Sequence, residues 1–285
     1  MRPIFQAILV AVVTGVIMAL VFHGKTNETA VQKESTFARI VRTGEIRCGY
    51  AITPSFLFVD PNTKEIHGIN HDIMEAIGKI LDVKIKWVEE VGWGDYIESM
   101  NAGRFDMMCA SVWPSGPRSK NSTLTKATVY NALYVVVREG DHRFDDNLEK
   151  INDPAVRMAV VENDVSHSIA HESYPQVQLD LLSPSSDWVM PVMDVMTGKA
   201  DVAFCDLGLF EDFNAKNPGK IMLVKGPPSR VYAEALSVPL GEHDLENALN
   251  ASITTLTNSG VIKGILSHYA GNYNPPAPEF SKNVP

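Results

Sequence analysis

Two series of alternating strand-like and helix-like segments constrain the fold of this chain more than any other feature of its sequence. In the first series, apolar runs predict strands over residues 45–51, 83–88 and 105–110, and amphipathic patterns predict helices over residues 73–81 and 93–100. Strands that alternate with helices are typical of βαβ units, which build a largely parallel sheet. The sequence therefore predicts an α/β fold.

The second series repeats this order further along the chain. Its predicted elements are a strand over 156–161, helices over 165–172 and 189–197, a strand over 200–206, and two terminal helices over 244–256 and 260–269. Two strand-like runs, residues 133–138 and 233–238, connect the two series. This organisation predicts two lobes with a hinge and a cleft between them, a geometry suited to closure around a small ligand.

An apolar run over residues 4–22 precedes the α/β part of the chain. At helical rise it reaches about 28 Å, close to the thickness of a bilayer's hydrocarbon core. We interpret residues 1–25 as an uncleaved signal anchor and residues 26–35 as a linker, with a cleaved signal peptide as the alternative. Arg2 favours a cytoplasmic amino terminus, so the remainder is expected in the periplasm, tethered to the inner membrane.

Composition excludes several classes of function. A net charge of −9 and a pI near 5.4 argue against nucleic acid and anionic membrane surfaces as partners. The sequence contains no C-x-x-C, P-loop or G-x-G-x-x-G motif, so no cofactor is predicted. Cys48, Cys109 and Cys205 each lie in an apolar run, and we interpret them as small buried hydrophobic residues rather than as a disulfide framework.

Arg118 is the strongest single candidate for a binding residue. It follows the predicted strand 105–110, in a segment rich in Pro, Gly and Ser that is predicted to form a turn. A guanidinium at the carboxyl end of a strand can hold a ligand carboxylate through two parallel hydrogen bonds, and open α/β sheets bind ligands at that end.

Several short motifs in a fixed order resemble those of one family. They are Arg47-Cys-Gly-Tyr50, the segments 68–72, 93–97 and 103–106, the Pro117-Arg118 turn, and the segments 200–206 and 259–266. Over residues 36–270 the chain resembles the family 3 extracellular solute-binding proteins, the polar amino-acid receptors of ABC importers. That resemblance implies a type II periplasmic-binding fold, with lobe 1 at 36–134 plus 236–270, lobe 2 at 135–235, and a Pro-rich tail at 271–285.

The resemblance also implies roles for individual residues. The residue matching Arg118 binds the ligand's α-carboxylate, and the one matching Asp206 binds the α-ammonium from the other lobe. Aromatic residues matching Tyr50 and Phe56 wall the side-chain pocket. From the residues alone, Asp206 can equally be the N-cap of a helix, and Tyr50 and Phe56 can be ordinary core residues.

Two positions depart from the family's pattern. Trp113 stands where the family has a Ser or Thr hydroxyl, so it either fills the pocket, packs at its rim, or offers a stacking face to a cation or ring. Asn163 and Asp164 stand where the family has a Gly-Thr pair that supports the carboxylate. Asp164 would repel a ligand carboxylate, unless it pairs with Arg118 across the cleft. It can instead select a cationic ligand or cap a helix.

These observations favour a periplasmic receptor for a small polar ligand, an amino acid or a related amine or carboxylate, acting with an ABC permease. Two alternatives are an enzyme on the same scaffold, similar to cyclohexadienyl dehydratase, and an anchored sensory or partner-binding domain. His167 and His171 are four residues apart on a predicted helix, but without a third ligand at a fixed spacing we interpret them as a solvated face and predict no metal site.

Overall fold

The computed structural model describes residues 14, 18, 34–53, 55–269 and 273–276. Residues Thr36–Pro285 form one compact unit, separate from Met1–Ser35. Apart from residues 14 and 18, the predicted signal anchor lies outside the described residues, as does most of the predicted linker. Within the described part of the chain, no helix has the length and apolarity needed to cross a membrane.

The first α/β series forms a parallel sheet as predicted. Strand β1 (Glu45–Tyr50) lies between β4 (Lys84–Glu90) and β5 (Met107–Val112) and is parallel to both. Helices α3 (Ile69–Leu81) and α4 (Tyr96–Asn101) connect these strands. The remaining elements around this sheet are α2 (Thr36–Thr43), the β2–β3 hairpin (Phe58–Val59 and Ile66–His67), α9 (His243–Asn258) and α10 (Val261–Leu266).

The second series forms another parallel arrangement. Strand β7 (Arg157–Val161) is parallel to β8 (Gln178–Leu182) and β9 (Val202–Asp206). Helices α6 (Val165–Ser173), α7 (Met190–Thr197) and α8 (Leu207–Lys216) accompany these strands, and β10 (Ile221–Leu223) pairs with β6. Gly198, in the left-handed conformation, ends α7, as expected for a helix predicted to end at residue 197.

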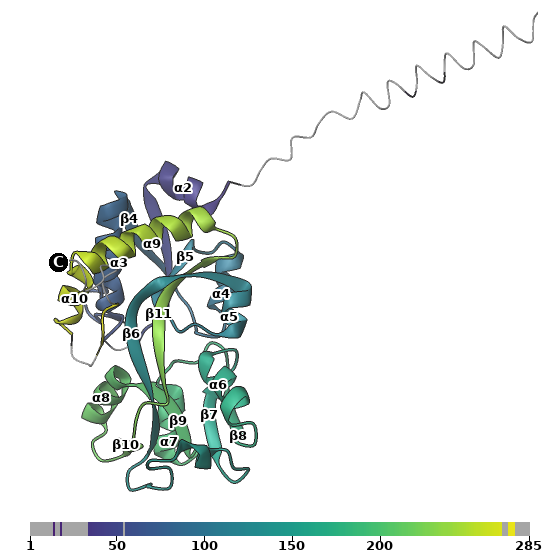
Figure 1. The fold of residues 1–285 in the computed structure, drawn as a ribbon, viewed down its shortest axis with the longest axis vertical. Helices are drawn as coiled ribbons and strands as arrows, with labels where there is room; N and C mark the ends of the chain where they lie inside the picture. The colour runs from purple at the N-terminus through teal and green to yellow at the C-terminus, as the bar shows by residue number, and fades with distance from the viewer. Residues whose placement is uncertain (1–13, 15–17, 19–33, 54, 270–272, 277–285) are drawn as a thin grey trace, which may run out of the picture. The chain divides into compact units, whose positions relative to one another are not determined.

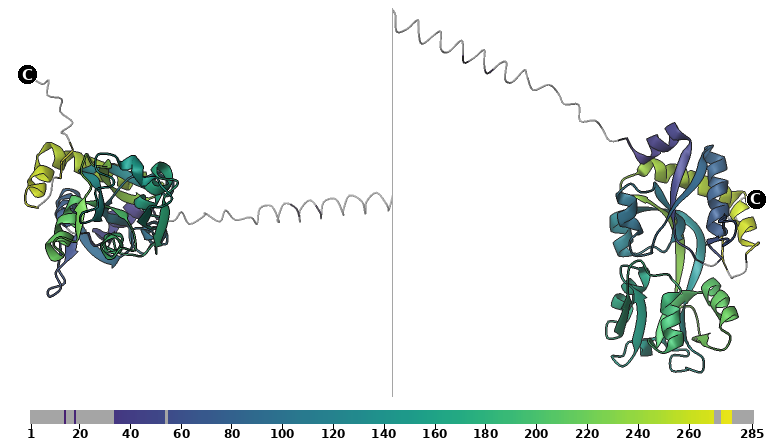
Figure 2. Two further views of the ribbon diagram at one scale, coloured as in Figure 1. Left: turned by 90° about the horizontal axis from the view of Figure 1, so that it is seen from below. Right: turned by 180° about the vertical axis from the view of Figure 1, so that it is seen from behind.

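Two long strands run through both series and join them, as Figures 1 and 2 show. Strand β11 (Arg230–Pro239) pairs antiparallel along its whole length with residues 122–133 of strand β6 (Ser122–Arg138). Strand β11 also pairs with β5, and β6 with β9, so that one nine-stranded sheet results. The predicted runs at 133–138 and 233–238 are therefore parts of longer strands, and the sheet is mixed where they cross.

Separate hydrophobic cores lie on either side of these crossing strands. One core, which we assign to lobe 1, is built mainly from residues between 40 and 129 and between 236 and 273. The other, assigned to lobe 2, is built mainly from residues between 133 and 224. Each lobe buries its own apolar side chains, and β6 and β11 are the elements that both share.

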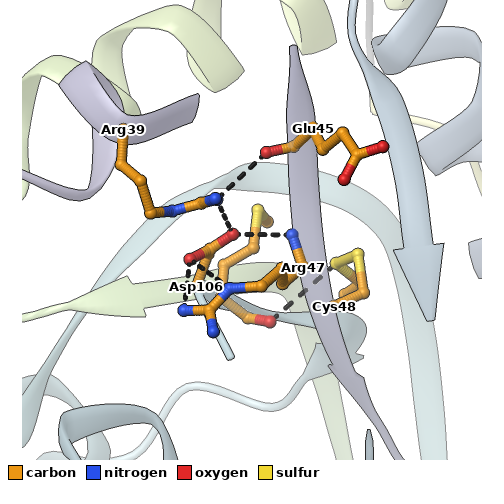
Figure 3. The surroundings of a disulfide bond; sticks show 7 residues. Arg39, Glu45, Arg47, Cys48 and Asp106 are labelled. Atoms are coloured by element: carbon orange, nitrogen blue, oxygen red, sulfur yellow. Dashed lines mark hydrogen bonds and ion pairs between the residues drawn. A yellow bond between two sulfur atoms is a disulfide. The ribbon is translucent and has the colours of Figure 1, made fainter. Parts of the chain in front are cut away.

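The interpretation of Cys48 and Cys109 as unpaired residues is wrong, because the two form a disulfide (Figure 3). Cys48 in β1 and Cys109 in β5 lie on neighbouring parallel strands, with their Cα atoms 5.3 Å apart. Sequence spacing does not reveal this register. The third cysteine, Cys205, is buried and free. A disulfide in the core of a lobe is typical of proteins from an oxidising compartment.

Beside the disulfide, a buried carboxylate binds two arginines (Figure 3). Asp106, directly before β5, pairs with the side chain of Arg39 and with Arg47 Nη2 at 2.9 Å. It also accepts a hydrogen bond from the Arg47 backbone N–H at 2.6 Å. The start of β5 is thereby attached to α2 and β1, which fixes the strand whose far end leads to Arg118.

Part of the segment predicted as a C-terminal tail packs against the domain. Tyr273 is buried and its ring makes an edge contact with Phe56, with centroids 4.8 Å apart. The backbone of Asn274 pairs with that of Tyr130 in β6. This segment therefore extends the packing of lobe 1 to a crossing strand.

The disulfide should contribute measurably to stability. It closes a loop of 61 residues, and disulfides typically stabilise a fold by about 2–4 kcal/mol, with loops of this size toward the upper end of that range. We expect reduction to lower the free energy of unfolding of the full-length protein by that amount, and to do the same in a Cys205→Ala variant. A thiol assay in denaturant should find one reactive thiol before reduction; finding all three would disprove the pairing.

Candidate functional site

A small, partly open cavity lies between the two lobes. The space in it that water molecules can occupy is about 30 Å³, which has room for roughly two or three waters. The lining residues are Thr53, Phe56, Asn70, Trp93, Ser111, Trp113, Arg118, Asp164, Trp188, Asp206 and Glu234.

Arg118 lies in a short helix, α5 (Gly116–Asn121), and not in the turn that the sequence predicts. Ser115 caps this helix by accepting a hydrogen bond from the Arg118 backbone N–H. The guanidinium is buried and donates to the carbonyl oxygens of Trp113 at 2.9 Å and Trp93 at 3.2 Å. It also lies 5.5 Å from the centroid of the Tyr96 ring. Lobe 1 thus holds this cation in a fixed position.

Asp164 of lobe 2 forms an ion pair with Arg118. Arg118 Nη2 and Asp164 Oδ1 are 2.7 Å apart, and the two side chains are 4% and 3% exposed. Asp164 is also the N-cap of α6, because its second oxygen accepts hydrogen bonds from the backbone N–H and hydroxyl of Ser166. Two of the roles considered for Asp164, the pairing across the cleft and the helix cap, are therefore combined in one side chain.

The lobes also meet through their backbones close to this ion pair. The Gly94 N–H of lobe 1 donates to the Pro184 carbonyl of lobe 2 at 3.1 Å. A Cβ atom at Gly94 would collide with the carbonyl oxygen of Glu162, so only glycine allows this approach. The contact holds the Trp93 carbonyl, and with it Arg118, against lobe 2.

Asp206 ends β9 and caps helix α8 on the lobe 2 side of the cavity. Its Oδ1 accepts a hydrogen bond from the Leu209 N–H at 2.8 Å. Burial raises the pKa of Asp206 to about 6, although the backbone N–H groups of Leu209 and Gly208 and the side chain of Asn131 lower it. At neutral pH this carboxylate is mostly ionised, and no cationic side chain in the described part of the chain forms an ion pair with it.

Glu234, in the crossing strand β11, is a second buried acid in the cavity. Its Oε1 accepts hydrogen bonds from Trp113 Nε1 at 2.6 Å and Asn131 Nδ2 at 2.8 Å. Burial, together with the nearby charge of Asp206, raises the pKa of Glu234 to about 8 despite these two donors. The side chain is therefore mostly protonated at neutral pH.

Aromatic rings from both lobes form much of the cavity wall. Trp113 stacks on Tyr232 of β11, with centroids 5.2 Å apart, and contacts the edge of Trp188 of lobe 2 at 5.4 Å. Phe56 and Trp93 also line the cavity. Trp113 therefore walls the cavity, packs between the lobes and donates to Glu234, in place of the hydroxyl that the family resemblance implied.

One lining hydroxyl lacks a hydrogen-bond partner. Thr53 is buried, and its Oγ1 has no partner among the described residues. Two other polar lining residues, Ser111 and Asn70, are satisfied by each other, because the Ser111 hydroxyl donates to Asn70 Oδ1 at 2.7 Å. Buried polar groups are usually satisfied, so the Thr53 hydroxyl is available to accept or donate a hydrogen bond within the cavity.

Of the seven predicted site residues, five line the cavity: Phe56, Trp113, Arg118, Asp164 and Asp206. Tyr50 and Asn163 are not among the lining residues. The Tyr50 ring instead makes an edge contact with Trp87, and Asn163 takes a left-handed conformation in the turn before α6. His167 and His171 lie on α6 with their Nε2 atoms 3.0 Å apart, and no group of three metal-ligating side chains occurs within the described residues.

Sequence reasoning missed Glu234, Trp188, Trp93 and Thr53. Glu234 did carry a signal, because it is the one charged residue in the apolar run 233–238. An acid at such a position must be buried with specific partners. Trp188 and Trp93 carried none, since tryptophan in a loop before a helix does not reveal which surface it covers.

A cleft between two α/β lobes that share long crossing strands, with charged side chains from both lobes facing a shared cavity, defines a binding protein of the two-lobe periplasmic type. The chain belongs to the bacterial extracellular solute-binding proteins, family 3, whose model matches residues 46–272. No match to the chain was found among curated proteins.

Solved structures of similar proteins share the fold. An ancestral amino-acid-binding protein, a precursor of cyclohexadienyl dehydratase, is similar with a TM-score of 0.70, 20% identity, and coverage of 82% of this chain and 99% of that one. An amino acid ABC transporter substrate-binding protein from Streptococcus pneumoniae, bound to L-arginine, is similar with a TM-score of 0.69 and 15% identity. The match covers 81% of this chain and 96% of that one. A solute receptor for L-cysteine of Neisseria gonorrhoeae is similar with a TM-score of 0.69 and 20% identity. The match covers 82% of this chain and 93% of that one.

The raised pKa of Glu234 makes stability depend on pH in a defined direction. Between its ordinary value of 4.5 and about 8, the folded protein keeps a proton that the unfolded chain releases, so this group's contribution to stability falls as pH rises through that window. Replacing Glu234 with Gln keeps the hydrogen-bonded oxygen and removes the titration. The variant should therefore gain stability over wild type as pH rises from 4.5 to 8, by an amount on the order of a few kcal/mol.

Urea unfolding of both proteins across that pH range measures the difference. Glu149→Gln, at an exposed glutamate, is the matched control and should follow wild type. A Glu234→Gln curve that stays parallel to wild type would show that Glu234 does not keep its proton in the folded state.

Proposed function

We propose that this protein is a receptor that captures a small polar, amine-bearing solute in the cavity between its lobes and delivers it to an ABC permease. The observation that carries the proposal is the cavity itself. It is lined by both lobes, and buried charged groups from each of them face it. Because ligand contacts would come from both lobes, binding favours the closed arrangement.

In this proposal Asp206 binds the ammonium group. It is buried, mostly ionised at neutral pH and unpaired with a cation among the described residues, and Thr53 and Glu234 face the same cavity. An ammonium donates up to three hydrogen bonds, which these oxygens can accept. Arg118 supports closure by joining the lobes through Asp164.

Location in the periplasm supports this role. The family is extracellular, and the buried disulfide suits an oxidising compartment. Anchoring through residues 4–22 stays a prediction, as do the lobe boundaries 36–134 plus 236–270 and 135–235. A tether would keep the receptor close to its permease.

An enzymatic role has one observation in its favour, namely that Glu234 is a buried and mostly protonated acid beside a ligand cavity, as a general acid must be. The same cavity disfavours the dehydratase reading, since a prephenate-like substrate carries two carboxylates and would face Asp164, Asp206 and Glu234. Turnover of prephenate or arogenate by the purified protein would establish that alternative.

A thermal-shift screen of the full-length protein tests the proposal. The panel contains amino acids, small amines and organic acids. A ligand at a hundred times its dissociation constant adds about 2.7 kcal/mol to stability, which raises the melting temperature by several degrees. A panel without any hit would contradict a receptor for this class of solute.

The role of Asp206 is tested with the solute that binds. Asp206→Asn removes the charge but keeps the helix cap, because Asn is an equally good N-cap. We expect at least a tenfold loss of affinity by calorimetry with little change in melting temperature. The matched control is Asp212→Asn in the same helix, where the exposed carboxylate pairs with Lys216; unchanged binding in Asp206→Asn would place the ammonium elsewhere.

A further inference from the structure

The subsite that would receive a ligand carboxylate is already filled by the protein. Both terminal nitrogens of Arg118 are engaged, one by the Trp113 carbonyl and the other by the Trp93 carbonyl and Asp164. Asp164 in turn uses its first oxygen for Arg118 and its second for Ser166. A ligand carboxylate would have to displace a buried carboxylate that also caps a helix.

The remaining charge in the cavity is negative. Arg118 balances Asp164, while neither Asp206 nor Glu234 has a cationic partner in the described part of the chain. Because Asp206, with a pKa of about 6, is the more acidic of the two, this pair of acids keeps negative charge in the cavity at neutral pH. A ligand with one positive charge and no negative charge complements it, whereas a zwitterion leaves the cavity charge unbalanced and adds a carboxylate to three acidic side chains.

The walls suit an organic cation of small size. Trp113, Trp188 and Phe56 present aromatic surfaces to the cavity, and such rings attract cations through their faces, most strongly when water is excluded. Thr53 Oγ1, unpartnered within the described residues, adds a neutral acceptor for an N–H group. The narrow volume limits the group that enters to a few heavy atoms beside the ammonium.

We propose that the cavity selects a small primary ammonium ion that lacks a carboxylate, with Asp164 acting as a built-in substitute for the carboxylate of an amino acid. This inference rests on the proposed function and specifies its ligand class. Asp206 and the Thr53 hydroxyl bind the ammonium, and the aromatic side chains that line the cavity pack around the carbon attached to it. Asp164 thus determines specificity by occupying Arg118.

Three matched pairs of small probes differ only in the carboxylate: ethylamine and alanine, ethanolamine and serine, propylamine and 2-aminobutyrate. We expect the full-length wild-type protein to bind at least one of these amines at least a hundredfold more tightly than the amino acid paired with it, measured by calorimetry at neutral pH. The Asp164→Asn variant keeps a helix-capping side chain and releases the charge of Arg118. Its affinity for that amino acid should rise at least tenfold, and the preference for the amine should shrink accordingly.

Asp212→Asn is the matched control and should keep the wild-type preference, with circular dichroism confirming that both variants are folded. If wild type binds an amino acid as tightly as its paired amine, the inference is wrong and the proposed receptor function stands. If Asp164→Asn is folded but gains no affinity for the amino acid, Asp164 does not exclude the carboxylate and the inference also fails. If none of the six probes binds, both the ligand class and the proposed capture of small amine-bearing solutes are overturned.

Discussion

The buried ion pair between Arg118 and Asp164 is the interaction on which the arrangement of the two lobes depends. Each charge would be costly to bury alone, and each is held by its own lobe: Arg118 by two carbonyl oxygens, Asp164 by the first turn of α6. The pair therefore joins two preformed partners. Its position closes the cavity on one side. It also makes Arg118, the one cation among the described residues that line the cavity, unavailable to a ligand.

Another part of the cavity holds two acids that have no cationic partner among the described residues. Asp206 caps a helix and Glu234 accepts from Trp113 and Asn131, yet burial raises the pKa of both. Acids with perturbed pKa values concentrate at functional sites, because the charge of a bound ligand can compensate a buried charge that the protein leaves unpaired. Trp113 connects the two sides, since its carbonyl accepts from Arg118 while its indole donates to Glu234.

Much of the fold could be predicted because strand and helix periods are local. The segments around β1, α3, β4 and β5 were identified from their patterns, and the family resemblance ordered them into lobes. Five of the seven predicted site residues line the cavity, because side chains at strand ends converge in an α/β sheet. Helix α5 was missed because Pro and Gly in Ser115–Pro117 indicate a turn as readily as a capped helix start. Glu234 was missed because an acid in an apolar strand indicates a buried charge but does not show which groups it faces.

The sequence by itself determined the α/β class, the two-lobe organisation and the family, since all three depend on patterns and motifs ordered along the chain. Only the tertiary structure decided which side chains face each other. The register of β1 and β5 paired Cys48 with Cys109, and the packing of the lobes placed Asp164 on Arg118, 46 residues away. Such contacts depend on how separately folded surfaces meet, and local periodicity carries no information about that geometry.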